Sequence, residues 1–184
     1  MSLLLTLSGL IDRLNTMVGR SVYWLILLAV LVSSGNAVIR YTFNASSNAW
    51  LEIQWYLFSA VFLLTAGYTL LRNEHIRIDV LTGHFSLRTQ AWIDILGGLF
   101  FLLPVAIIIG WLSIPIFVDS LVTGELSSDA GGLIRWPAKL LIPAGFLLLI
   151  LQGVSEIVKR AAFLCGRLDH WGAPAAGSHG GAQQ

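Results

Sequence analysis

The stretch ILGGLFFLLPVAIIIGWLSIPIFV, residues 95–118, decides the fold class of this chain. It holds 24 residues without a charged side chain and lies between Asp94 and Asp119. A soluble helix carries a polar face, whereas this run is apolar on every face. At about 1.5 Å per residue, its length is sufficient to cross the hydrocarbon of a bilayer, which is about 30 Å thick. The run therefore predicts a transmembrane helix, bent by Pro104 and Pro115.

Three further uncharged runs accompany this one, at residues 21–39, 53–71 and 140–155. The last run has only 16 residues, but it can span if Lys139 and Glu156 lie at the two interfaces. The chain is 56% hydrophobic and 11% charged, whereas soluble domains carry about 25% charged residues. The sequence predicts an all-α integral membrane protein with four transmembrane helices. A soluble helical bundle with a large core is the disfavoured alternative.

The distribution of Lys and Arg predicts the orientation. Eight of these residues lie on the side that holds both termini: Arg13, Arg20, Arg72, Arg77, Arg88, Lys159, Arg160 and Arg167. Three lie on the other side: Arg40, Arg135 and Lys139. Because cytoplasmic segments of bacterial membrane proteins carry the excess of positive charge, both termini are expected in the cytoplasm. The chain is thus predicted to be a multi-pass protein of the bacterial inner membrane.

The segments outside the spans are expected to differ in character. In residues 1–19, apolar side chains recur at helical spacing: Leu3, Leu4, Leu7, Leu10, Ile11, Leu14 and Val18. This pattern predicts an N-terminal amphipathic helix on the inner membrane surface. The alternative is a cleaved signal peptide with Ser33-Ser34-Gly35 as the small-residue site. Residues 20–160 form the predicted membrane domain, and residues 161–184 form a cytoplasmic tail whose Gly- and Ala-rich end is predicted to be disordered.

The sequence offers little that would support catalysis or a cofactor. All four histidines lie outside the apolar runs, which disfavours a membrane haem. No ionisable residue lies near the middle of a run, which disfavours a stand-alone carrier or pump. The sequence has no phosphate-binding glycine loop and no suggestive Ser-His-Asp set. With no basic cluster, a nucleic-acid partner is not expected. We predict no enzyme and no cofactor.

Two polar clusters of residues are candidates for a role in assembly. On the extracytoplasmic side, Arg40 ends the first run and Glu52 precedes the second. A short turn can bring them together as an ion pair, and the alternative is two independent interfacial charges. On the cytoplasmic side, the connector contains His75, Arg77 and Asp79. If it is helical, His75 and Asp79 share a face, and the alternative is an ordinary solvated connector.

The same connector also suggests a metal site, although weakly. Its Glu74, His75, Asp79 and His84 are suitable ligand types, but their spacing matches no familiar pattern. We therefore predict no metal. The second run instead carries small residues, Ser59, Ala60, Ala66 and Gly67, which let membrane helices approach closely. A short chain with such a surface and no polar pathway of its own is typical of a subunit that packs against another protein.

The order of several short motifs resembles one transporter family. These motifs are Arg40-Tyr41, Trp50 with Glu52, Gly67, His75-Ile76-Arg77-Ile78-Asp79, Trp136-Pro137, Ile142-Pro143-Ala144-Gly145-Phe146, and Gln152 to Glu156. Together they make the chain similar to the small integral membrane subunit (DctQ type) of tripartite ATP-independent periplasmic (TRAP) transporters. The resemblance extends over about residues 19–160. The loop at residues 119–139 is longer than in the commonest members of that family.

The resemblance implies two partners and a transport role. A large multispan subunit carries the substrate and the coupling ion, and a periplasmic binding protein delivers the substrate, typically an organic acid. The small subunit would brace the large one during this symport, and the loop at residues 119–139 faces the side where the binding protein docks. The alternative is a stand-alone four-helix membrane protein, such as an assembly factor or a small channel. Neighbouring genes for a large permease and a secreted binding protein would separate the two.

Overall fold

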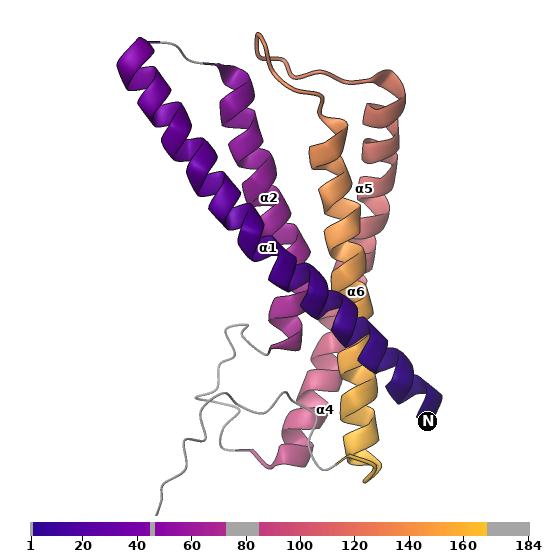
Figure 1. Ribbon diagram of the computed structural model, residues 1–184. Coiled ribbons are helices and arrows are strands. Elements are labelled where there is room, and N and C mark those ends of the chain that lie inside the picture. Colours follow the sequence, from indigo (N-terminus) through magenta and orange to yellow (C-terminus); the bar gives the residue numbers. More distant parts are fainter. Residues whose placement is uncertain (1, 45–46, 73–84, 169–184) are drawn as a thin grey trace, which may run out of the picture.

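The computed structural model describes residues 2–44, 47–72 and 85–168, and their architecture is helical (Figure 1). The helices are α1 (Ser2–Phe43), α2 (Asn48–Leu71), α4 (Leu87–Gly97), η1 (Gly98–Leu102), α5 (Leu103–Thr123) and α6 (Trp136–Leu164). Since α4, η1 and α5 follow one another directly, the described residues form four long helical stretches. All four are long and apolar enough to cross a membrane. The predicted all-α fold with four membrane-spanning helices is confirmed.

The N-terminal segment differs from its prediction. Helix α1 runs without a break over 42 residues, which at 1.5 Å per residue is about 63 Å, so no separate interfacial helix precedes the first span. The leucine stripe also faces away from the protein, since Leu3 and Leu7 are exposed while Ser8 and Asn15 are buried. The prediction was wrong because it treated the apolar face as the membrane-bound face of an isolated helix. In the structure the polar face of the same segment packs against α6.

The buried face of α1 follows a seven-residue repeat. Its members are Ser8, Asn15, Val22, Ala29 and Asn36, each 9% exposed or less. A seven-residue period keeps one seam of a helix turned toward its neighbours along its whole length. Because four of these five side chains are small or polar, the seam allows close approach to α2 and α6, against which α1 packs.

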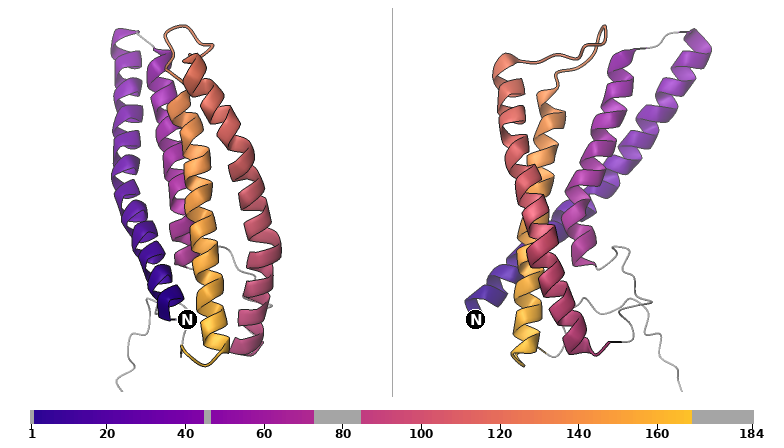
Figure 2. Two further views of the ribbon diagram at one scale, coloured as in Figure 1. Left: turned by 90° about the vertical axis from the view of Figure 1, so that its right-hand side faces the viewer. Right: turned by 180° about the vertical axis from the view of Figure 1, so that it is seen from behind.

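The third stretch bends where its sequence removes a backbone hydrogen bond. Residues Gly98–Leu102 form a π-helical turn, and Pro104 lies just after it, in the first turn of α5. Proline has no N–H to donate and its ring crowds the preceding turn, and a widened turn accommodates both effects. Figure 2 shows the resulting stretch curved along its length.

The four stretches are splayed rather than parallel. At the end that carries the α5–α6 loop, here called the loop end, the α1–α2 pair diverges from the α5–α6 pair (Figure 1). At the opposite end, here called the N-terminal end, α1 crosses α6 (Figures 1 and 2). Helix α2 packs against both α1 and α6, and α6 packs against α5. The four stretches therefore form a frame whose helices pack together at the N-terminal end and diverge at the loop end.

Glycines mark close contacts between α2 and its neighbours. A Cβ added to Gly145 of α6 would lie 2.7 Å from the carbonyl oxygen of Leu63. One added to Gly67 of α2 would lie 2.3 Å from Oδ1 of Asn15 and 3.0 Å from the carbonyl oxygen of Leu148. Of the small residues singled out on the second run, Ala60 and Gly67 are buried, while Ser59 and Ala66 are half-buried. Part of this small-residue surface thus serves contacts within the chain.

Candidate functional site

At the loop end, the α5–α6 loop is joined to α2 by side chains that project from one face of that helix. Asn48, Glu52 and Tyr56 recur every four residues, so they lie one above another along the helix. The Asn48 amide donates to the carbonyl oxygen of Ala130 at 3.0 Å. The Tyr56 hydroxyl donates to the carbonyl oxygen of Ile134 at 3.1 Å. These two contacts attach the α5–α6 loop (residues 124–135) to α2.

The carboxylate of Glu52 is the central contact of this attachment. It accepts a hydrogen bond from the backbone N–H of Leu133 at 2.6 Å and another from the hydroxyl of Ser127. The loop fits because residue 132 is glycine: a Cβ there would lie 2.4 Å from the Cβ of Ser127 and 2.7 Å from Oε1 of Glu52. Glu52 is only 7% exposed, so the loop replaces the water that an interfacial carboxylate would otherwise bind.

A second set of charges holds the loop to the start of α6. The ammonium group of Lys139 contacts the carboxylate of Glu125, and the guanidinium of Arg135 lies 3.7 Å from it. Arg135 also donates to the hydroxyl of Ser128 at 3.3 Å. The hydrogen bond from Lys139, together with the nearby positive charges, lowers the pKa of Glu125. Glu125 therefore remains charged at neutral pH and keeps the loop folded back on α6.

The predicted ion pair between Arg40 and Glu52 is wrong. The loop occupies the carboxylate of Glu52, whereas the guanidinium of Arg40 lies 5.9 Å from the ring centroid of Tyr41, its neighbour in α1. The sequence argument considered only the short connection between the two helices. It could not include the loop, which is distant along the chain but supplies a backbone N–H and a hydroxyl that satisfy the carboxylate directly.

We expect Glu52→Ala to release the loop from α2. The change removes both acceptors and leaves the N–H of Leu133 without its partner, so hydrogen exchange at Leu133 should rise several-fold in detergent-solubilised protein. Asp119→Ala is a matched control, since it removes an exposed carboxylate close to the same loop. Equal exchange at Leu133 in wild type and Glu52→Ala would contradict the proposed attachment.

The N-terminal end holds a cluster of polar residues shared by three helices. This polar cluster consists of Ser8, Asp12 and Asn15 of α1, Asp94 of α4, and Gln152, Ser155, Glu156, Lys159 and Arg160 of α6. Gln152 lies at its centre and is fully buried. Its side chain accepts from Asn15 at 2.9 Å and donates to Asp12 at 2.9 Å and to Glu156 at 3.0 Å. One side chain thus bridges α1 and α6.

The charged members of the polar cluster are paired with one another. Lys159 lies 3.1 Å from Asp12 and also contacts Glu156. Nε of Arg160 lies 2.9 Å from Oδ2 of Asp94, and Nη1 of Arg160 contacts the carboxylate of Glu156. Buried charges are tolerated only when they are paired and hydrogen-bonded. The polar cluster therefore joins α1, α4 and α6 without leaving a free cation or carboxylate among its members.

Most of the chain matches the sequence model of one protein family. Residues 29–163 match the DctQ component of the tripartite ATP-independent periplasmic transporters. This range covers nearly three quarters of the 184 residues. The chain belongs to this family. Comparisons with curated proteins and with solved structures find no match. A DctQ component is part of a transporter, so transport and a multi-pass membrane location follow for this chain.

The DctQ match includes most of both sites. Glu52, the α5–α6 loop and the α4 and α6 members of the polar cluster lie inside residues 29–163. Asp12 and Asn15 lie before this range, in the part of α1 predicted to be a separate helix. The sequence held a signal for the α6 members, because Gln152, Glu156 and Lys159 recur at helical spacing. It gave no signal for the helices that would meet them.

The connector between α2 and α4, for which an assembly role was predicted, spans residues 73–84. His75, Arg77 and Asp79, and with them Glu74 and His84 of the weak metal hypothesis, lie outside the described residues. Within the described ranges, no group of three or more His, Cys, Asp or Glu side chains is arranged to hold a metal ion. The proposed role of the connector in assembly stays a prediction.

Proposed function

We propose that this DctQ component is the small membrane subunit that braces the large transport subunit of a TRAP transporter. In this proposal the large subunit carries out ion-coupled uptake of an organic acid, which a periplasmic binding protein delivers. The family supplies the transporter context, and the organic acid is the substrate class that the resemblance implies. The bracing role rests on one observation: in the described part of the chain, the polar side chains hold its own helices together and line no route across the membrane.

The polar side chains at the two ends of the frame are engaged in holding helices together. Glu52 is engaged by the α5–α6 loop, and Glu156 and Arg160 are engaged within the polar cluster. Between these two ends, the described parts of the helices carry no charged side chain that could line a route for an anion or a cation. Such an arrangement suits a rigid frame and does not suit a carrier.

The outer faces of the frame are extensively apolar. Phe62 of α2, Phe101 of η1 and Trp111 of α5 are each more than 70% exposed. In a membrane, such faces contact either lipid chains or the helices of another subunit. The splayed α5–α6 and α1–α2 pairs thus offer broad surfaces for a large multispan partner.

We also propose that the chain lies in the bacterial inner membrane with both termini in the cytoplasm, on the basis of the eight-to-three distribution of Lys and Arg. The exposed Cys165 must first be changed to Ser. In that background, cysteines introduced at Asn44 and Gly124 should react with an impermeant reagent added from the periplasmic side. Labelling of Gly124→Cys only from the cytoplasmic side would contradict the topology.

The bracing proposal predicts that the chain does not transport by itself. Proteoliposomes containing only this chain should show no uptake of organic acids above empty vesicles, since no polar route is evident. Vesicles with the large subunit and the binding protein should gain ion-dependent uptake when this chain is added. Uptake by the chain alone, or an equal rate without it, would contradict the proposal.

A further inference from the structure

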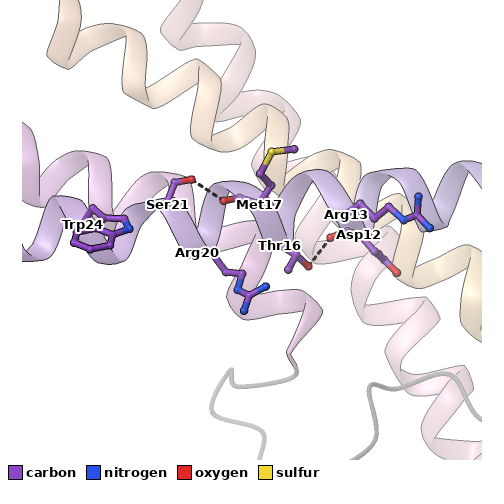
Figure 3. Close-up of a pocket in the computed structure, with 7 residues that line it drawn as sticks. All are labelled: Asp12, Arg13, Thr16, Met17, Arg20, Ser21 and Trp24. Atoms are coloured by element: carbon purple, nitrogen blue, oxygen red, sulfur yellow. Dashed lines mark hydrogen bonds between the residues drawn. The ribbon is translucent and has the colours of Figure 1, made fainter.

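Helix α1 carries an outward stripe whose chemistry changes in order along the helix. It starts with Arg13, Met17, Arg20 and Trp24 (Figure 3) and continues with Leu28 and Leu31. These positions follow one another at intervals of three or four residues, so they share one face of the helix. At 100° per residue, this face is opposite the buried seam that includes Asn15, Val22 and Ala29. The stripe therefore points away from the rest of the chain.

The two arginines of the stripe are available for an external anion. Both are exposed, and neither guanidinium has an ion-pair partner among the described residues. Asp12 also lies beside them (Figure 3), but its carboxylate is paired with Lys159 at 3.1 Å. Because the stripe carries two guanidinium groups, its surface keeps a net positive charge even beside this carboxylate.

The arginines lie at the level of a membrane interface. A Cβ added to Gly19 would contact the ring of Tyr68, and α2 ends shortly after that residue, at Leu71. Because the apolar part of α2 stops here, lipid headgroups are expected at this level. Trp24, which is 73% exposed, comes next along the stripe, and tryptophan prefers the headgroup boundary. Leu28 and Leu31 then continue toward the middle of the membrane.

We propose that this stripe is a binding site for an anionic phospholipid. The guanidinium groups of Arg13 and Arg20 would bind the phosphate from both sides with charge-assisted hydrogen bonds. The indole of Trp24 would lie beside the glycerol region, and an acyl chain would lie along Met17, Leu28 and Leu31. The order of basic, aromatic and aliphatic residues matches the order of headgroup, glycerol and acyl chain. The site goes beyond the bracing function and does not depend on it.

Native mass spectrometry of the purified, delipidated chain tests this site. Phosphatidylglycerol should bind about tenfold more tightly than phosphatidylcholine with the same acyl chains, a difference of about 1.4 kcal/mol. The reason is that phosphatidylglycerol carries a net negative charge, whereas the choline group of phosphatidylcholine offsets its phosphate. The variant Arg13→Gln/Arg20→Gln should lose this preference. The control Arg40→Gln/Arg167→Gln removes the same charge from two exposed arginines elsewhere and should keep the preference.

A competition arm separates a lipid from a free anion. Soluble glycerol phosphate at millimolar concentration should not displace phosphatidylglycerol, because it lacks the acyl chains that contact the apolar part of the stripe. Displacement by glycerol phosphate would overturn the lipid assignment. Equal affinity for the two lipids in the wild type, or an equal loss in the control variant, would overturn the site itself.

Discussion

Replacing Arg160 with alanine is expected to lower the free energy of unfolding by about 3 kcal/mol, the cost of leaving a buried carboxylate without its cation. Arg160 is 3% exposed, and its guanidinium contacts carboxylates from two helices, Asp94 of α4 and Glu156 of α6. Its removal leaves the carboxylate of Glu156 buried with one cation fewer beside it. It also removes the hydrogen bond from Nε of Arg160 to Oδ2 of Asp94, which ties α4 to α6.

The measurement is the unfolding midpoint in detergent, followed by tryptophan fluorescence. Arg167→Ala is the matched control, since Arg167 is an exposed arginine a few residues further along the chain. Arg160→Lys should fall between wild type and Arg160→Ala, because lysine keeps the charge but cannot reproduce the guanidinium geometry. If Arg160→Ala and Arg167→Ala unfold at the same midpoint, the polar cluster does not stabilise the fold.

Gly145→Ala is expected to have an effect of similar size for a steric reason. A Cβ at this position would lie 2.7 Å from the carbonyl oxygen of Leu63 and 2.8 Å from its Cβ. Since the crowded atoms belong to the backbone and to the stem of a side chain, no rotamer change relieves the contact. Helices α2 and α6 must separate, and overpacking of this kind costs about 1–3 kcal/mol. The change should also weaken the attachment of the α5–α6 loop, because Glu52 moves with α2.

Gly35→Ala is the control for this substitution. Gly35 lies inside α1, and no atom would lie within 4 Å of an added Cβ. Alanine is favoured over glycine in a helix by about 1 kcal/mol, so Gly35→Ala should leave the unfolding midpoint unchanged or raise it. If Gly145→Ala, like Gly35→Ala, leaves the unfolding midpoint unchanged or raises it, the close α2–α6 contact is contradicted.

The contact partners of Gly145 and Glu156 could not be predicted from the sequence. Gly145 and Glu156 were both noted from the sequence, the first within a family motif and the second as the charge that ends an apolar run. Neither observation assigned a partner. Leu63, which lies against Gly145, belongs to the stretch Val61-Phe62-Leu63-Leu64, which is apolar on every face. Asp94, which is joined to Glu156 through Arg160, is in the sequence only the boundary of a different run.

The sequence by itself determined the fold class, the four membrane-spanning helices and the family. These properties depend on local composition, because a bilayer requires about 20 apolar residues for each helix wherever that helix packs. The tertiary structure alone decided that Glu52 binds the α5–α6 loop instead of Arg40, and that the polar face of α1 lies inside. In a bilayer, lipid satisfies the leucines of α1 as well as a protein interior does, so hydropathy does not reveal the packed face. Polar side chains must find partners on other helices, and which helices meet them is set by where those helices cross.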